Sequence, residues 1–256
     1  MARKTVKSKK KATKKPAKPS RKAAVRKSAP RRSPKAARKP ARKPGAKAAG
    51  KPTLHGSPFS GPTYKVALML ALLGEPFDFT PVDLRAGAHK TPEFLAINRY
   101  GQIPAMADGD LSLCQSGAIL QYLAAKHGKF AGKDAQQQAR AREWLFWDAD
   151  RLSPGVFRTR AMIRGFVNLA PETGLYFRDH AESGLRVLEA QLGKSKFVAG
   201  VEPTIGDVAC YGVLAFAREG AFDIALYPNI AAWMERMQAL KGFKPPYELL
   251  PLPGSA

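Results

Sequence analysis

Three places in the chain carry residues whose types and positions could serve chemistry or binding. Ser60 precedes an apolar stretch that ends at Gly74, so it is expected to begin a helix. Gln115 and Ser116 follow a strand and begin another helix, whose unpaired N–H groups and partial positive charge suit a carboxylate. Between them, Gln102-Ile103-Pro104 contains an X-Pro bond, the one kind of peptide bond in which cis is common.

The cysteines and histidines argue against metal or dithiol chemistry. Cys114 and Cys210 are far apart, and neither lies in a CxxC or metal-ligand spacing. The histidines are scattered at positions 55, 89, 127 and 180. We therefore predict buried free thiols and no bound metal.

The elements around these residues predict a mixed α/β unit over residues 53–129. Strands are expected at 53–56, 77–84, 103–109 and 111–114, and helices at 60–74, 91–97 and 116–128. The order β-α-β-α-β-β-α combines a parallel crossover with a terminal hairpin. That order is typical of the thioredoxin-like plan.

A second unit, residues 135–246, shows only helical periodicity. A polar connector at 129–133 separates it from the first, and helices are expected around 136–166, 172–193, 205–220 and 228–240. The Pro-rich end is expected to stop regular structure. Thr204 and Asp207 fit a capping box, which serves folding and is worth about 1 kcal/mol. The fold class is thus α/β followed by an all-α helical bundle.

Residues 1–52 form a tail of a different composition. Met1–Thr53 carry 22 Lys and Arg and no Asp or Glu, so nearly all of the net charge of +23 lies there and about +1 remains for the rest of the chain. The tail has no aromatic residue and too few apolar side chains to offset the entropy of ordering it. We predict that it is a disordered polycation.

The chain is expected to be an intracellular protein. No apolar run approaches the ~18 residues of a membrane span, and no apolar segment or cleavage site of a signal peptide follows the basic N-terminus. We predict a cytoplasmic location, with nucleoid association through the tail as an option.

Four strings resemble the glutathione S-transferase family over residues 53–243. They are HGSPFSGPTYKVALMLALLG at 55–74, VDLRAGAHKTPEFLAINRYGQIPAM at 82–106, DGDLSLCQSGAILQYLAAKHG at 108–128 and EPTIGDVACYGVLAF at 202–216. A closing helix carries YPNIAAWMERM. Their order and spacing imply a thioredoxin-like domain that binds glutathione, followed by the helical domain of that family.

The resemblance assigns the backbone of the tripeptide to the proline loop. Gln102, Ile103 and Pro104 match the family's loop that ends in a cis-proline, where the N–H and C=O of Ile103 pair with the cysteinyl backbone of glutathione. Arg99 stands where the family usually has Pro, which predicts a looser loop.

The two ends of glutathione are assigned by the same resemblance. Gln115 and Ser116 hold the γ-glutamyl end, and Gln in place of the family's frequent Glu predicts weaker binding. A cap role for Ser116 alone is the alternative. His89 and Lys90 lie where the family places a cation near the glycyl carboxylate, although an exposed loop Lys is often plain surface charge.

Glutathione reacts as the thiolate, so the site needs a donor that lowers the pKa of a thiol from about 8.5. The family's SxxxKV pattern places Ser60 in this role. Ser57, three residues earlier, and Tyr64, one helical turn further on, remain the alternatives. A Ser in place of Cys favours conjugation, halide displacement or peroxide reduction over mixed-disulfide chemistry.

The electrophile pocket of the family lies between the domains. Its candidate lining residues here are Phe59, Trp147, Phe157 and Arg158, although aromatic residues on a helix are more often part of the core.

Two hypotheses follow. The first is a glutathione transferase, with peroxidase or disulfide reductase side activity, that forms the homodimer of its family. The second is a non-catalytic relative delivered to DNA or RNA by the tail. The tail resembles those of linker histones and includes RRSPK at 31–35. It predicts binding to phosphates without base readout, and a tail without a partner is the alternative.

Overall fold

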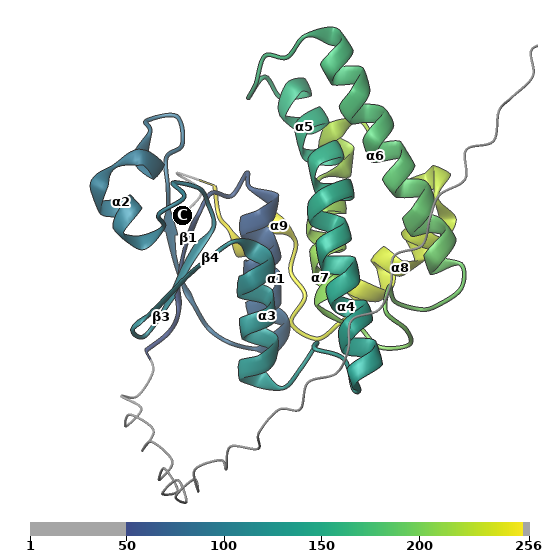
Figure 1. Cartoon of the computed structure of the whole chain (residues 1–256), viewed down its shortest axis with the longest axis horizontal. Coiled ribbons are helices and arrows are strands. Elements are labelled where there is room, and N and C mark those ends of the chain that lie inside the picture. Colours follow the sequence, from purple (N-terminus) through teal and green to yellow (C-terminus); the bar gives the residue numbers. More distant parts are fainter. Residues whose placement is uncertain (1–49, 253–256) are drawn as a thin grey trace, which may run out of the picture. The chain divides into compact units, whose positions relative to one another are not determined.

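The computed structural model describes residues 50–252, and the predicted disorder of the tail concerns residues that lie almost wholly outside this range. The first domain follows the predicted order of elements (Figure 1). Its strands and helices are β1 (Thr53–Gly56), α1 (Gly61–Leu73), β2 (Asp78–Pro81), a 3-10 turn (Ala88–Lys90), α2 (Pro92–Ile97), β3 (Ala105–Asp108), β4 (Leu111–Cys114) and α3 (Ser116–His127). The second and third strands are shorter than predicted.

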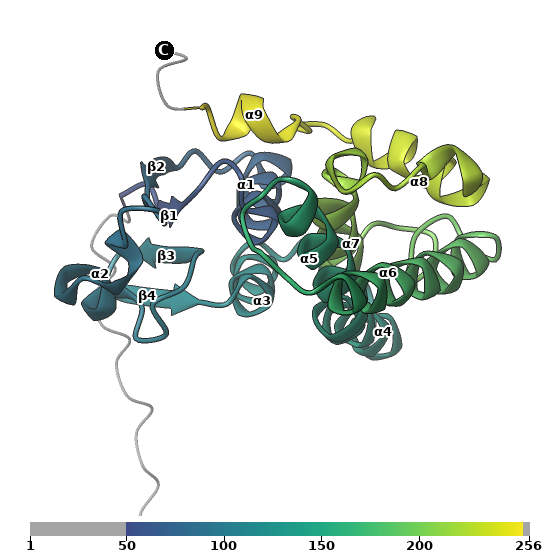
Figure 2. The ribbon, with the colours of Figure 1, turned by 90° about the horizontal axis from the view of Figure 1, so that it is seen from above.

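The strands form one mixed sheet in the order β2-β1-β3-β4. β1 and β2 are parallel, whereas β3 is antiparallel to both β1 and β4. Helices α1 and α3 cover one face and α2 lies on the other, as Figure 2 shows. A small cluster of Val82, Phe94 and Ala105 fills the space under α2. This arrangement confirms the thioredoxin-like plan.

Helix α1 begins and ends where the sequence predicts. The Ser60 Oγ accepts a hydrogen bond from the N–H of Thr63 at 3.2 Å, and Gly74 ends the helix with a left-handed φ of 70°. Nearly every side chain between them is buried, because the sheet lies on one side and the helical domain on the other.

The second domain consists of helices, as predicted, but with different boundaries. It contains α4 (Ala135–Trp147), a π-helical segment (Asp148–Leu152), α5 (Ser153–Ile163), α6 (Pro171–Leu192), α7 (Ile205–Leu214), two 3-10 turns (Ala217–Gly220 and Ile224–Leu226), α8 (Pro228–Gln238) and α9 (Pro246–Leu249). The helix predicted at 136–166 is present as a continuous helical stretch over 135–163, which contains a π-helical segment that the sequence did not predict. The prediction that regular structure stops in the Pro-rich end was wrong, because α9 forms there.

The two domains share one core. Helix α7 lies between α1 and α4, and the buried side chains of all three belong to one hydrophobic cluster. Helix α9 runs back along α1 (Figure 2), and the fully buried Tyr64 of α1 donates a hydrogen bond to the carbonyl of Lys244 at 2.9 Å. Among the described residues, no helix is both long and apolar enough to cross a membrane.

Candidate functional site

The sheet brings the three predicted pieces of the site to one edge. In the registers, Ala105 at the start of β3 faces His55 of β1 and Cys114 of β4. Since β3 is antiparallel to both neighbours, its beginning lies beside their ends. The loop before β3, the loop after β1 and the start of α3 therefore converge there.

Ser60 lies in the loop after β1 with its hydroxyl hydrogen available. Its Oγ accepts the N–H of Thr63, and its own N–H donates to the carbonyl of Ser57 at 3.0 Å. Within residues 50–252, no acceptor is found for the Ser60 O–H. The hydroxyl is half-buried at a helix N-terminus, where a developing anion is favoured.

The two alternatives to Ser60 differ in their surroundings. The Ser57 Oγ accepts the N–H of Phe59 at 3.3 Å, and its O–H, like that of Ser60, has no acceptor among residues 50–252, so Ser57 stays an alternative. Tyr64 is fully buried in the core, where its ring meets Phe216 edge-on and burial raises its pKa far above the usual value for a tyrosine. The structure thus gives Tyr64 a packing role.

The proline loop has the predicted conformation. The Ile103–Pro104 peptide bond is cis, and in the described part of the chain neither the N–H nor the C=O of Ile103 has a hydrogen-bond partner. Buried Asn98 organises the loop, because its side-chain amide donates to the carbonyl of Gln102 and accepts the N–H of Tyr100 at 3.0 Å. These bonds connect the two ends of the loop, and Arg99 lies between them at the position where the resemblance predicts loosening.

Within the described part of the chain, no side chain caps the start of helix α3. Gln115 is the N-cap residue and Ser116 the first helical residue, so the alternative of Ser116 as the cap was wrong. Gln115 has a φ of 69°, which is uncommon for a residue other than glycine. Its amide donates to the Gln102 side chain at 3.2 Å, which joins the proline loop to the start of α3.

His89 and Lys90 lie in the 3-10 turn before α2. The Lys90 Nζ donates to the carbonyl of Gly101 at 3.0 Å, so this side chain supports the proline loop. The Nδ1 of His89 is buried and has no hydrogen-bond partner among residues 50–252.

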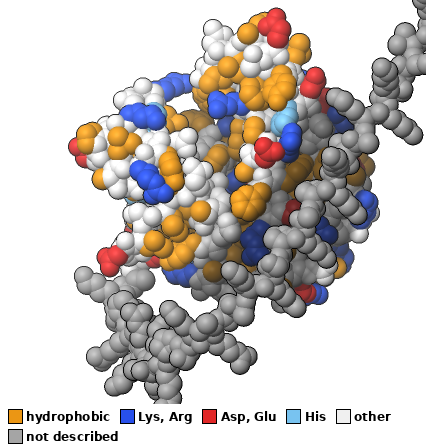
Figure 3. All heavy atoms as spheres, viewed as in Figure 1, with side chains coloured by type: hydrophobic (Ala, Val, Ile, Leu, Met, Phe, Trp, Pro, Cys, Tyr) orange, Lys and Arg blue, Asp and Glu red, His pale blue; other side chains and the backbone are white. Residues whose placement is uncertain are grey.

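The predicted substrate-pocket residues separate into two groups. Phe59 is exposed beside Ser60, and Phe157 packs so closely on Gly61 that a side chain at position 61 would overlap its ring. Arg158 is exposed on α5. In the view of Figure 3 the surface is hollowed between the part that carries α2 and the part that carries α5.

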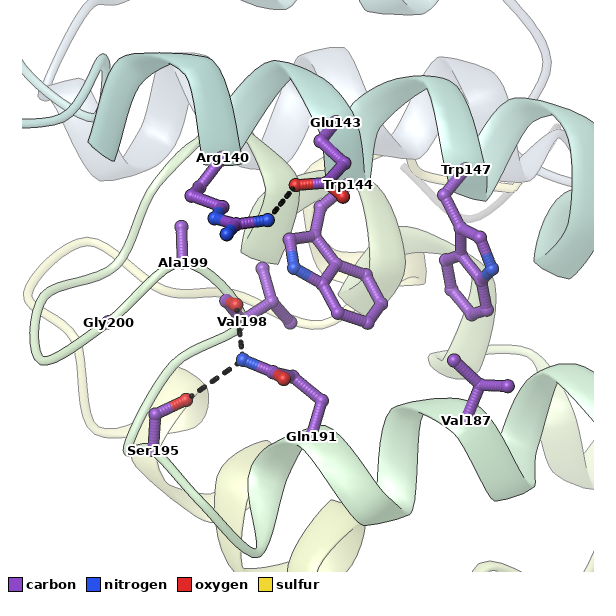
Figure 4. Close-up of a pocket in the computed structure, with 10 residues that line it drawn as sticks. All are labelled: Arg140, Glu143, Trp144, Trp147, Val187, Gln191, Ser195, Val198, Ala199 and Gly200. Atoms are coloured by element: carbon purple, nitrogen blue, oxygen red, sulfur yellow. Dashed lines mark hydrogen bonds and ion pairs between the residues drawn. The ribbon is translucent and has the colours of Figure 1, made fainter. Parts of the chain in front are cut away.

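Trp147 lines a different hollow. A pocket of about 470 Å³ lies between α4, α6 and the loop before α7, and none of the residues at the sheet edge lines it. Figure 4 shows Trp144 and Trp147 facing Val187 and Gln191 across this pocket, with Arg140 paired to Glu143 at its rim. The ring centroids of Trp144 and Trp147 are 4.8 Å apart.

Sequence reasoning missed several residues around Phe59. The Phe59 ring contacts Phe166 and Tyr247 at centroid distances of 6.2 and 6.3 Å, and the Phe59 carbonyl accepts a hydrogen bond from Arg160. These partners come from α5, the loop after it and α9. They are about 100 to 190 residues away along the chain, so no local pattern signals them.

Neither metal nor cysteine chemistry finds support here. The described residues contain no cluster of three or more His, Cys, Asp or Glu side chains that could hold a metal ion. Cys114 is half-buried and Cys210 fully buried, and burial raises the pKa of both thiols. Both are therefore poor nucleophiles at neutral pH.

Comparison with known proteins gives matches along most of the described chain. Residues 53–125 match the glutathione S-transferase N-terminal domain and residues 135–236 the glutathione S-transferase C-terminal domain. Glutathione S-transferase 3 of Zea mays is 36% identical over 214 residues, covering 78% of this chain and 95% of its own.

Two further matches have bacterial sources. The disulfide-bond oxidoreductase YfcG of Escherichia coli is 34% identical over 188 residues, which cover 69% of this chain and 85% of that protein. A crystal structure of a glutathione S-transferase from Pseudomonas fluorescens superposes with a TM-score of 0.73 at 32% identity, covering 77% of this chain and 99% of that one.

Proposed function

Because the chain belongs to the glutathione S-transferase family, we propose that it transfers glutathione to small electrophiles, with Ser60 as the residue that activates the thiol. The observation that carries the proposal is the convergence, at one edge of the sheet, of three groups that have free hydrogen-bonding capacity among residues 50–252. They are the Ser60 hydroxyl, the backbone of Ile103 and the uncapped start of α3.

Each group has one task in this proposal. The backbone of Ile103 pairs with the backbone of the tripeptide, and the free N–H groups at Ser116 receive the γ-glutamyl carboxylate. His89 and Lys90 face the glycyl carboxylate. The O–H of Ser60 donates to the sulfur, which favours the thiolate and lowers its pKa.

The reaction class follows from Ser at position 60. A serine cannot form a mixed disulfide, so the sulfur of glutathione itself must attack the substrate. Conjugation, halide displacement and peroxide reduction all use this nucleophile. Disulfide reduction, the activity named for the Escherichia coli relative, is a second candidate and would also proceed through glutathione.

A titration with glutathione tests binding first. At about 100 times its dissociation constant the ligand should add about 2.7 kcal/mol to the free energy of unfolding. Ser60→Ala should keep most of this stabilisation and lose most of the transfer rate with a panel of aryl halides, hydroperoxides and disulfides. No stabilisation, together with equal rates for wild type and Ser60→Ala, would contradict the enzyme and favour the non-catalytic alternative.

We further propose that the protein is a homodimer and that the basic tail tethers it to nucleic acid. Dimerisation is expected from the family. The tail's 22 cationic side chains without a single acidic one support contacts to phosphates.

A further inference from the structure

A buried arginine reaches the loop that carries Ser60. The side chain of Arg160 on α5 is 5% exposed, and its Nη1 donates to the carbonyl of Phe59 at 2.7 Å. Its Nε and Nη2 both donate to Oε2 of Glu219, at 3.1 and 2.9 Å. The guanidinium also lies 4.3 Å from the centroid of the Phe216 ring. Ion pairing, hydrogen bonding and ring contact thus fix its position.

This contact fixes the peptide unit that enters Ser60. The carbonyl of the Phe59–Ser60 peptide accepts from Arg160, and the N–H of the same peptide donates to the carbonyl of Ser57 at 3.0 Å. With both polar groups held, the peptide plane cannot rotate, so the direction of the Ser60 side chain is set. A carbonyl bonded only to water would leave that plane free to move.

The C-terminal helix completes the arrangement. The hydroxyl of Tyr247 on α9 donates to Oε1 of Glu219 at 2.8 Å, which leaves Oε2 to face Arg160. Its ring lies 6.3 Å from Phe59 and 6.2 Å from Phe216, measured between centroids. A chain of contacts therefore runs from α9 through Glu219 and Arg160 to the loop before Ser60.

We propose that Arg160 is a positioning residue for Ser60, held in place by Glu219 and Tyr247, and that it thereby sets the pKa of the bound glutathione thiol. The proposal rests on the proposed function of Ser60. Arginine suits the role because its planar fork donates to the carbonyl and the carboxylate at once. The single ammonium of a lysine lacks that geometry.

Arg160→Gln tests the proposal in two measurements. The first is the pH dependence of kcat/KM for the electrophile at saturating glutathione, and the second is the thiolate absorbance of bound glutathione. We expect the thiol pKa to rise by about one unit, which below that pKa means an about tenfold lower thiolate fraction and rate. The KM for glutathione should change little, because the proline loop and α3 are untouched. Arg164→Gln is the matched control, because Arg164 also pairs with Glu219, at 3.4 Å, and makes no bond to Phe59.

The Ser60→Ala background separates the two proposals. If Arg160 acts through Ser60, adding Arg160→Gln to Ser60→Ala changes neither the thiol pKa nor the rate further. A second, additive loss there would overturn the positioning role while leaving the enzyme intact. If Ser60→Ala alone had no effect, the proposed role of Ser60 would fail instead.

If Arg160→Gln does not fold, Arg160→Lys tests the same proposal. It keeps a cation beside Glu219, so the fold should survive, and the thiol pKa should still rise because the bond to Phe59 is lost. A wild-type pH profile in Arg160→Lys would overturn the proposal. Tyr247→Phe should shift the pKa in the same direction by less, since it removes one hydroxyl and keeps the ring.

Discussion

At the scale of single residues, a substitution of Tyr64 distinguishes a packing role of this side chain from a catalytic one. Its hydroxyl bonds to the carbonyl of Lys244 inside the core. Tyr64→Phe should therefore lower the free energy of unfolding by about 1 kcal/mol and leave the transfer rate and its pH profile unchanged. Urea unfolding and steady-state kinetics on the same preparation check both. An altered thiol pKa would return Tyr64 to the list of candidate activators.

Asp207 does more than the capping box predicted. The box is present, but the fully buried carboxylate also accepts the N–H of Val198 at 2.8 Å and the indole N–H of Trp233 at 3.0 Å. It therefore joins α7 to α8 and to the preceding loop. The sequence pattern identified the local half of this role, since Trp233 lies 26 residues away.

The difference in free energy of unfolding between wild type and Asp207→Asn should depend on pH because of this burial. Burial raises the pKa of Asp207 to about 6, although the bonds from Val198, Thr204 and Trp233 act in the opposite direction. A carboxyl whose pKa is higher in the folded than in the unfolded state contributes to the free energy of unfolding when it is protonated. This contribution is complete below about pH 3.9 and is lost as pH rises through 6. The stability advantage of wild type over the variant should narrow by about 2–3 kcal/mol between pH 4 and pH 7.

Urea unfolding of both proteins across that range measures the difference. If the stability advantage of wild type over Asp207→Asn grows with pH, the four hydrogen bonds donated to the Asp207 carboxylate outweigh its burial and lower its pKa. Because Asp207 lies away from the sheet edge, glutathione binding should be the same in both proteins at temperatures where both are folded.

At the scale of elements, one buried ion pair joins the two domains beneath the site. Lys65 of α1 pairs with Asp148 of the π-helical segment, and both are almost fully buried. Ser153 completes the group, because its Oγ accepts from Lys65 at 2.8 Å and donates to Asp148 at 2.9 Å. These bonds hold α1, and with it Ser60, against the start of α5.

Removing one partner should cost more than removing both. Lys65→Met leaves Asp148 charged and buried without its cation, so it should cost about 3–5 kcal/mol. Lys65→Met combined with Asp148→Leu should recover a large part of that loss. Unfolding free energies of the two single variants and the double variant test this coupling, and simple additivity would contradict it.

The sequence predicted the elements whose signals are local and missed those that depend on distant residues. Helix α1 was predicted because its capping residues, Ser60 and Gly74, are local. The π-helical segment at 148–152 was not, since it is accompanied by a bond that Lys65, 83 residues away, donates to Asp148. The candidate site divides in the same way: Pro104 and Gln115 carry local signals, whereas the contact of Arg160 with Phe59 spans 101 residues.

At the scale of the whole molecule, the proposed dimer needs an apolar surface. Phe146 of α4 is 66% exposed, and it precedes Trp147, which lines the pocket between α4 and α6. Phe146→Asp should shift the protein from dimer to monomer in sedimentation velocity. Leu226→Asp is the matched control, because Leu226 is 74% exposed on the turn before α8 and should leave the dimer unchanged. A wild type that is monomeric at all concentrations would contradict the dimer.

The tail and the folded body carry very unequal charge. With about +1 left after residue 53, the body has little attraction for a polyanion, so any retention on duplex DNA should come from the tail. The full chain should bind at low salt with an affinity that falls by about 0.9 log units per log unit of salt for each phosphate neutralised. A chain that starts at Pro52 should lose this binding and keep its transfer rate. Equal retention of the two over a salt series would remove nucleic acid from the function of the tail.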